Sequence, residues 1–318
     1  MVDVMEIDID RPEKVVYVVG LGPGEPFYMT QQAANTLESV DAICGYKVYL
    51  DLIRDEFPCE EYYSTGMTQE IDRCRWALEK ASTGKRVALV CSGDAGVYGM
   101  ASPLLELAPD YPDVAVDIVP GLTAALSGGA VLGAPLAHDF CVISLSDRLT
   151  PWEVIEKRLA CAAMGDFCVA LYNPSSKGRP DYLAKTVRIL LENGKSADTV
   201  CGLVRNIGRD GQTARVLSLA QLESTAVDMF TTVYIGNTAT RQLVFSGTTE
   251  GRVFSRQLAA LGAQVLVSVA TPLGAEEQGE ADGITVHCGR LTTEEMAALL
   301  QGAALCVDAT HPYAVDAT

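Results

Sequence analysis

Three times within its first 125 residues, the chain passes from a short, largely apolar stretch directly into a loop that contains glycine. The apolar stretches cover residues 15–19, 87–91 and 114–119. Short apolar runs of this kind are typical of strands buried in a parallel sheet. Parallel strands end at one edge of their sheet, and α/β proteins bind ligands at that edge. The pattern therefore predicts an α/β fold whose ligand site is built from these loops.

The three loops offer backbone groups and one carboxylate to a ligand. They read Gly-Leu-Gly-Pro-Gly from Gly20, Ser-Gly-Asp-Ala-Gly from Ser92 and Pro-Gly-Leu-Thr-Ala from Pro120. Glycine in such a loop lets the backbone approach a ligand closely, and Asp94 can bind a hydroxyl or an amine. For each loop alone, an ordinary turn between a strand and a helix explains the pattern equally well, with Asp94 as a helix-capping residue.

The composition limits the classes of function. The chain has a formal charge of -17. Proteins that bind nucleic acids usually carry a basic surface, so we expect no nucleic-acid partner. No apolar run reaches the roughly 18 residues of a membrane span, and acidic residues 1–13 are predicted to be a short disordered lead. The ten cysteines form no Cys-x-x-Cys pair, and the three histidines lack metal-ligand spacing. We therefore expect reduced thiols, a cytoplasmic location and no metal site.

Strand and helix patterns alternate along the rest of the chain. They predict helices over residues 97–107 and 121–132, a helix capped by Thr68, and a capping box at residues 150–153 with Pro151 at the first helical position. The patterns divide the chain into an α/β subdomain at 14–119, a second at 120–240, and a new βαβ beginning at 241–318.

Seven motifs in the first 240 residues resemble one family. GLGPG at 20–24, SGDAGVYGM at 92–100 and PGLTA at 120–124 are similar to the three S-adenosylmethionine loops of the tetrapyrrole (precorrin) methylases. LSDRLTPWEVIEKRL at 145–159, YNPSSKGRP at 172–180, LVRNIGRDGQ at 203–212 and TTVYIGN at 231–237 resemble precorrin-3B C(17)-methyltransferases and their cobalt-pathway counterparts. The resemblance is collinear over about residues 14–240. It implies two α/β subdomains of the tetrapyrrole methylase fold with a cleft between them.

The resemblance also implies the reaction. A methyl group would pass from S-adenosylmethionine to carbon 17 of precorrin-3B, or of cobalt-factor III, with ring contraction, in cobalamin biosynthesis by a homodimer. The sulfonium already activates the methyl group, so the protein mainly has to align the reacting atoms. The implied cofactor-binding residues are Pro23, Gly93, Asp94, Val97, Thr123, Ala124, Tyr172 and Asn206.

The substrate of such an enzyme carries many carboxylates, which an acidic protein must meet with local cations. The loops of the second subdomain supply Arg148, Lys177, Arg179, Arg205 and Arg209. Taken one at a time, each of these also fits a solvated surface charge. Ring contraction needs proton transfers as well, for which loop position suggests Asp147, His138 and Asn173 as catalytic residues. His138 fits a structural histidine equally well.

The last 78 residues resemble the N-terminal part of precorrin-6A reductase, an NADPH enzyme. The motifs are FSGTTEGR at 245–252, SVAT at 268–271 and DATHPYA at 308–314. Gly247, Thr248 and Thr249 would meet the phosphates of NADPH at a helix N-terminus, and His311 and Tyr313 resemble substrate-side residues. The alternative is a capped turn without a ligand.

Two other functions fit parts of the pattern. One is a methylase of the same fold that acts on another precorrin or on a macromolecule. The other is a non-catalytic scaffold that binds S-adenosylmethionine. Binding of a precorrin would distinguish the substrates, and transfer of a labelled methyl group would exclude the scaffold.

Overall fold

The computed structural model describes residues 14–176, 178–246, 249–260, 263–300 and 303–309. The chain divides into two compact units, residues 1–124 and 125–318, and each is described by itself. The expected lead at 1–13 lies outside the described residues, as do His311 and Tyr313. The cleft and the subdomain boundaries expected from the sequence stay predictions.

A five-stranded parallel sheet forms the centre of the first unit, in the order β3-β2-β4-β1-β5. Its strands are β1 (Val15–Gly20), β2 (Ala42–Tyr46), β3 (Glu61–Thr65), β4 (Arg86–Cys91) and β5 (Ala115–Val119). β1 pairs with β4 on one side and with β5 on the other. The three glycine loops follow β1, β4 and β5, so they emerge side by side at one edge, as the sequence predicts.

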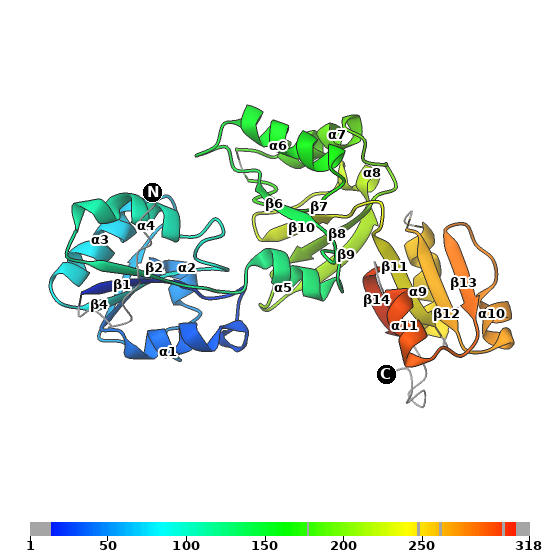
Figure 1. Ribbon diagram of the computed structural model, residues 1–318, viewed down its shortest axis with the longest axis horizontal. Coiled ribbons are helices and arrows are strands. Elements are labelled where there is room, and N and C mark those ends of the chain that lie inside the picture. Colours follow the sequence, from blue (N-terminus) through cyan, green and yellow to red (C-terminus); the bar gives the residue numbers. More distant parts are fainter. Residues whose placement is uncertain (1–13, 177, 247–248, 261–262, 301–302, 310–318) are drawn as a thin grey trace, which may run out of the picture. The chain divides into compact units, whose positions relative to one another are not determined.

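Helices cover both faces of this sheet (Figure 1). They are α1 (Gln31–Ser39), α2 (Lys47–Leu50), α3 (Glu70–Ser82) and α4 (Ala101–Leu107), with the 3-10 turns η1 (Pro26–Tyr28) and η2 (Ala108–Asp110). Alternate residues of β1 enter opposite cores: Val16 and Val18 share a cluster with α3 and α4, whereas Val15 and Val19 share one with α1. This period-two alternation is the geometry of a strand buried on both faces.

Two helix starts in the first unit differ from the predictions. The helix expected from Val97 begins at Ala101, because Asp94 accepts the amide hydrogen of Val97 and Tyr98 has a φ of 54°. Thr68 does not cap α3, since its φ of 69° is incompatible with the extended backbone of an N-cap. The cap of α1 is Thr30, whose hydroxyl accepts a 3.1 Å hydrogen bond from the amide of Ala33.

The second unit contains a mixed sheet in the order β6-β7-β10-β8-β9. Its strands are β6 (Phe140–Ser144), β7 (Cys168–Tyr172), β8 (Val200–Arg205), β9 (Thr213–Ser218) and β10 (Thr231–Ile235). β6 and β7 are parallel, and β10 lies antiparallel between β7 and β8. Hence β6, β7 and β8 run in the same direction, and the loops after them share one edge.

Both faces of the mixed sheet carry helices. They are α5 (Ala124–Val131), α6 (Trp152–Met164), α7 (Tyr182–Glu192) and α8 (Leu219–Leu222). Leu159 of α6 and Leu190 of α7 are fully buried in the cluster on one face. On the other face α5 packs so closely that a methyl group at Gly128 would collide with the Tyr234 hydroxyl.

Two further predicted helix starts, those of α5 and α6, are wrong. The helix expected from Gly121 begins at Ala124. The capping box at residues 150–153 does not form, because Pro151 is the N-cap of α6, with extended backbone and no side-chain capping bond.

A separate parallel sheet follows, in the order β13-β12-β11-β14. It contains β11 (Arg241–Ser246), β12 (Val265–Val269), β13 (Ile284–Cys288) and β14 (Ala303–Ala309), with α9 (Thr249–Ala260), α10 (Pro272–Gln278) and α11 (Thr293–Leu300). The first strand lies between the second and the fourth, which is the order of one half of a doubly wound dinucleotide fold. The expected beginning of a Rossmann-like domain is confirmed. Among the described residues, no helix is long and apolar enough to cross a membrane.

Candidate functional site

Backbone hydrogen bonds join the first two glycine loops. The amide of Gly22 donates to the carbonyl of Gly93 at 3.0 Å, and the amide of Gly93 donates back to Gly22 at 2.7 Å. A Cβ atom at Gly20 would lie 2.7 Å from the Gly93 carbonyl oxygen and 2.8 Å from the Gly121 nitrogen. All three loops therefore meet so closely at Gly20 that no side chain fits there.

Asp94 ties the second loop to the third. Its Oδ1 accepts hydrogen bonds from the amides of Gly96 at 2.8 Å and Val97 at 3.0 Å. Its Oδ2 accepts from the amide of Gly121 at 3.0 Å. Asp94 therefore acts in part as a capping residue, because its carboxylate stabilises the conformation of both loops. Contact between Asp94 and a ligand stays a prediction.

The third loop is also fixed from α1. The Thr30 hydroxyl donates to the Pro120 carbonyl at 3.1 Å while it caps α1. Gly93 has a φ of 73°, and a Cβ atom there would find its nearest neighbour 3.8 Å away, at the Thr123 Cα. The conformation of Gly93 therefore requires glycine, while the space beside it is open.

These loops fit a cofactor held by main-chain and apolar contacts. Val97 and Ala124 are half-buried, whereas Pro23 and Thr123 are buried. Thr123 and Ala124 are the nearest neighbours of the space at Gly93. The donor set consists mainly of backbone groups, which suits alignment of an already activated methyl group.

At the edge of the mixed sheet, two other predicted cofactor residues are engaged within their own unit. The hydroxyl of Tyr172 accepts the amide hydrogen of Ala125 at 2.7 Å and so fixes the first turn of α5. Asn206 has a φ of 53°, and its Nδ2 donates to the Asp210 carbonyl at 3.4 Å. Both residues stabilise loops at the carboxyl ends of strands, and their contact with a cofactor stays a prediction.

The structure brings Asp147 and Arg179 together. Arg179 Nη1 lies 3.2 Å from Asp147 Oδ1, and the Tyr182 hydroxyl donates to Asp147 Oδ2 at 2.6 Å. Hydrogen bonds from Tyr182 and Arg179 hold the pKa of Asp147 below its usual range. A lowered pKa favours the ionised carboxylate, the form that holds Arg179. A catalytic role for Asp147 stays a prediction.

The other two catalytic candidates lie at opposite edges of the sheet. Asn173 follows β7, and its Nδ2 donates to Ser144 Oγ at 3.0 Å, beside the Asp147 loop. His138 precedes β6 and is exposed, so it lies at the amino edge. The topology therefore separates His138 from Asp147 and Asn173, and the catalytic role of His138 stays a prediction, as does the structural alternative.

Of the remaining predicted substrate cations, Arg205 is paired. Arg205 Nε lies 2.7 Å from Asp228 Oδ2. Burial raises the pKa of Asp228, but hydrogen bonds from Arg205 and Thr231 outweigh it and lower the pKa below its usual value. Arg148 is exposed, Arg209 is half-buried, and Lys177 lies outside the described residues.

With this geometry in place, the chain can be compared with known proteins. Residues 15–223 match the family model for Tetrapyrrole (Corrin/Porphyrin) Methylases. The chain belongs to this family. The match confirms the expected family, α/β fold and enzyme class.

The alignments of this methylase with its relatives span most of the length of each relative. A probable cobalt-factor III C(17)-methyltransferase of Salmonella typhimurium is 44% identical over 224 residues, which are 70% of this chain and 92% of the relative. A precorrin-3B C(17)-methyltransferase of a Sinorhizobium species is 40% identical over 230 residues, 71% of this chain and 90% of the relative. The crystal structure of the methyltransferase CobJ is 39% identical, with a TM-score of 0.66, and covers 71% of this chain and 95% of that one.

The last part of the methylase chain matches a second family model. Residues 241–318 match Precorrin-6x reductase CbiJ/CobK, which confirms the resemblance seen in the sequence. Thr249 is the first residue of α9, directly after the loop that follows β11. Gly247 and Thr248 of that loop lie outside the described residues. The loop follows the strand at which the sheet order reverses, the usual position of a dinucleotide.

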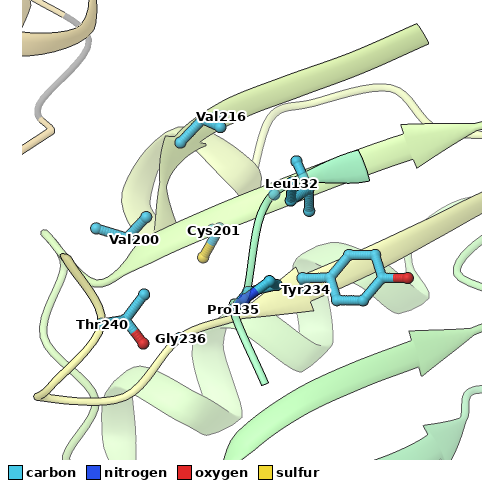
Figure 2. Close-up of a pocket in the computed structure, with 9 residues that line it drawn as sticks. Leu132, Pro135, Val200, Cys201, Val216, Tyr234, Gly236 and Thr240 are labelled. Atoms are coloured by element: carbon cyan, nitrogen blue, oxygen red, sulfur yellow. The ribbon is translucent and has the colours of Figure 1, made fainter. Parts of the chain in front are cut away.

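One small cavity of the methylase lies away from all these loops (Figure 2). It encloses about 10 Å³, enough for one water molecule at most. Val200 lies at the amino end of β8 and Gly236 follows the carboxyl end of β10, so the cavity is at the edge of the sheet opposite the Asp147 loop. Its lining is apolar apart from Thr240 and Tyr234, and we assign it no ligand.

Sequence reasoning missed three residues beside Arg179, namely Ser146, Ser176 and Tyr182. Each hydrogen-bonds to Arg179 or to its partner Asp147. Their positions in loops after β6 and β7, or at the first residue of α7, were the available signal.

Proposed function

We propose that this methylase transfers the methyl group of S-adenosylmethionine to carbon 17 of precorrin-3B or of cobalt-factor III, with contraction of the macrocycle, in cobalamin biosynthesis. The observation that carries this proposal is the 40–44% identity to two C(17)-methyltransferases over at least 90% of their length. The linked glycine loops support it, because they form the kind of backbone site that the reaction needs.

The first unit would align the donor. S-adenosylmethionine supplies a methyl group that its sulfonium has already activated. The main chain at Gly93, with Pro23, Val97, Thr123 and Ala124, would hold the donor, and Asp94 would keep the loops in register. Fixing the reacting atoms in an attack geometry can lower a barrier by about 7 kcal/mol or more.

The second unit would hold the carboxylates of the substrate. Arg148, Arg179 and Arg209 lie in the loops after β6, β7 and β8, and Arg205 is the last residue of β8. All four are at one edge of the mixed sheet. Guanidinium groups bind carboxylates through planar, charge-assisted hydrogen bonds. We assign Asp147 an anchoring role toward Arg179. At the same edge, Asn173 would orient the substrate by hydrogen bonds of its amide, which is not titratable.

The segment from β11 onward would bind NADPH. Its sheet order and its match to the reductase family support a dinucleotide at the loop before α9. Binding of NADPH to the full chain, followed by nicotinamide fluorescence, tests this second function. An unchanged spectrum at millimolar NADPH would contradict it.

We further propose a homodimer that acts in the cytoplasm. The nine cysteines whose side chains are described are free thiols, which suits a reducing compartment. Light scattering on the purified chain tests the dimer, since a mass of one chain would contradict it.

The reaction is tested by incubating the full chain with S-adenosylmethionine and a trimethylated precorrin, with and without cobalt. Mass spectrometry should show the gain of one methyl group, and the arm with the higher rate identifies the substrate. No methylated product in either arm would contradict the proposed function.

A further inference from the structure

Arg179 is held by three acceptors from two loops. Its Nε donates to Ser176 Oγ at 3.0 Å, and its Nη1 donates to Ser146 Oγ at 2.8 Å and to Asp147 Oδ1 at 3.2 Å. The side chain is only 16% exposed. This degree of fixation is unusual for an arginine that merely carries surface charge, because such side chains keep much of their rotamer freedom.

A count of donors shows what remains for a ligand. A guanidinium has five N–H donors, one on Nε and two on each Nη. The three bonds above use the donor of Nε and both donors of Nη1. Within the described parts of the chain, no acceptor reaches Nη2. Among the described residues, the two Nη2 donors of this largely buried cation are therefore left without an acceptor, and a ligand can supply one.

Tyr182 holds the carboxylate of Asp147, and that carboxylate in turn holds Arg179. Its hydroxyl donates to Asp147 Oδ2 at 2.6 Å, so each carboxylate oxygen of Asp147 has one partner. The ring of Tyr182 packs on Trp152 with centroids 4.4 Å apart, and Lys185 lies 5.1 Å from its centroid. These contacts hold the hydroxyl at the first residue of α7, where it restrains Asp147.

We propose that Arg179 is a preorganised receptor for one carboxylate of the tetrapyrrole, and that Tyr182, Ser146 and Ser176 are positioning residues that hold it in place. This inference rests on the proposed function, because the substrate class comes from there. The remaining Nη2 hydrogens suit a carboxylate because a hydrogen bond between a guanidinium and a carboxylate is charge-assisted, and the ion pair with Asp147 fixes their direction. The recognised group is a propionate or acetate arm, of which one oxygen accepts an Nη2 hydrogen.

The test compares Tyr182→Phe and Ser176→Ala with wild type in methyl transfer by the full chain. Tyr182→Phe removes one hydroxyl and keeps the ring on Trp152. Loss of a hydrogen bond to a charged group should raise the KM for the tetrapyrrole about tenfold. The KM for S-adenosylmethionine should stay within about twofold of wild type, since those loops are in the other unit. Arg179→Gln should raise the tetrapyrrole KM further than either variant.

Matched variants separate this role from a structural one. Arg188→Gln on α7 breaks a comparable ion pair with Glu223, 2.7 Å apart, and should leave both KM values unchanged. Tyr111→Phe controls for loss of a phenol elsewhere. Methylation by wild type with an unchanged tetrapyrrole KM in Tyr182→Phe and Ser176→Ala overturns the inference alone. The inference is also overturned if these variants lower kcat and the melting temperature but leave the tetrapyrrole KM unchanged. Absence of methylation by wild type would instead contradict the proposed function.

Discussion

At the scale of single residues, Asp94 has the largest expected effect on the donor site. Its side-chain hydrogen bonds link the second and third glycine loops. Asp94→Ala removes acceptors for three backbone amides, so we expect the affinity for S-adenosylmethionine to fall about tenfold or more. Isothermal titration measures it, with the exposed Asp113→Ala as control. Equal affinity in both variants would contradict this role.

Lys195 is a second residue with a predictable effect, this time on stability. Its nearly buried ammonium donates to Asp166 Oδ1 at 2.8 Å and to the carbonyls of Phe167 and Gly236 at 2.9 Å each. Lys195→Met leaves these acceptors unpaired and should destabilise the fold by about 3 kcal/mol. Urea unfolding measures the loss, and a change below about 1 kcal/mol would contradict the assignment.

The same pair predicts an effect of pH. Burial alone would raise the pKa of Asp166. The hydrogen bonds from Lys195 and Thr238 have the larger combined effect, so the pKa lies below its usual value. A carboxyl whose pKa is lower in the folded state stabilises the fold above its unfolded pKa of about 3.9. That contribution disappears as the pH falls through the folded pKa. Asp166→Asn should therefore show a smaller loss of stability than wild type between about pH 5 and pH 2, and equal slopes would contradict this.

At the scale of elements, the start of α1 links helix formation to the ligand loops. Thr30 caps the helix and donates to the Pro120 carbonyl. Thr30→Ala should cost about 1 kcal/mol of stability and weaken cofactor binding, whereas Thr30→Ser keeps both bonds. Thermal unfolding with and without S-adenosylmethionine separates the two effects. Equal behaviour of both variants would disprove the link.

Elements were predictable where a local pattern decides them. Apolar stretches before glycine loops located β1, β4 and β5. For β1 and β4 the reason is that strands buried on both faces need no alternation. Predicted helix starts were wrong where a tertiary hydrogen bond overrides the local preference. The amide of Val97 donates to Asp94, so α4 begins only at Ala101. The antiparallel insertion of β10 has no local signal, since strand direction is set by partners distant in sequence.

Side-chain networks between loops were beyond sequence reasoning for the same reason. The motifs placed Asp147 and Arg179 in separate loops, as a catalytic residue and a substrate cation. Only the fold shows that they pair with each other and with Tyr182. Conversely, the loops that meet at Gly20 were predictable, because parallel strands necessarily end at one edge.

At the scale of the whole molecule, the chain joins a methylase to a reductase-like segment. The C(17)-methyltransferase relatives align with about 70% of this chain. We therefore expect a chain ending at residue 240 to keep methyl transfer within about twofold and to lose NADPH binding. Rates and nicotinamide fluorescence measure both. Loss of methyl transfer in a folded truncated chain would show that the two parts depend on each other.

The central claim is that three linked backbone loops hold the methyl donor. A crystal structure of the full chain with S-adenosylhomocysteine tests it most directly. The account predicts the ligand against the main chain of residues 20–24, 92–97 and 121–124, beside Gly93. A ligand bound elsewhere, with these loops free of it, would contradict the account.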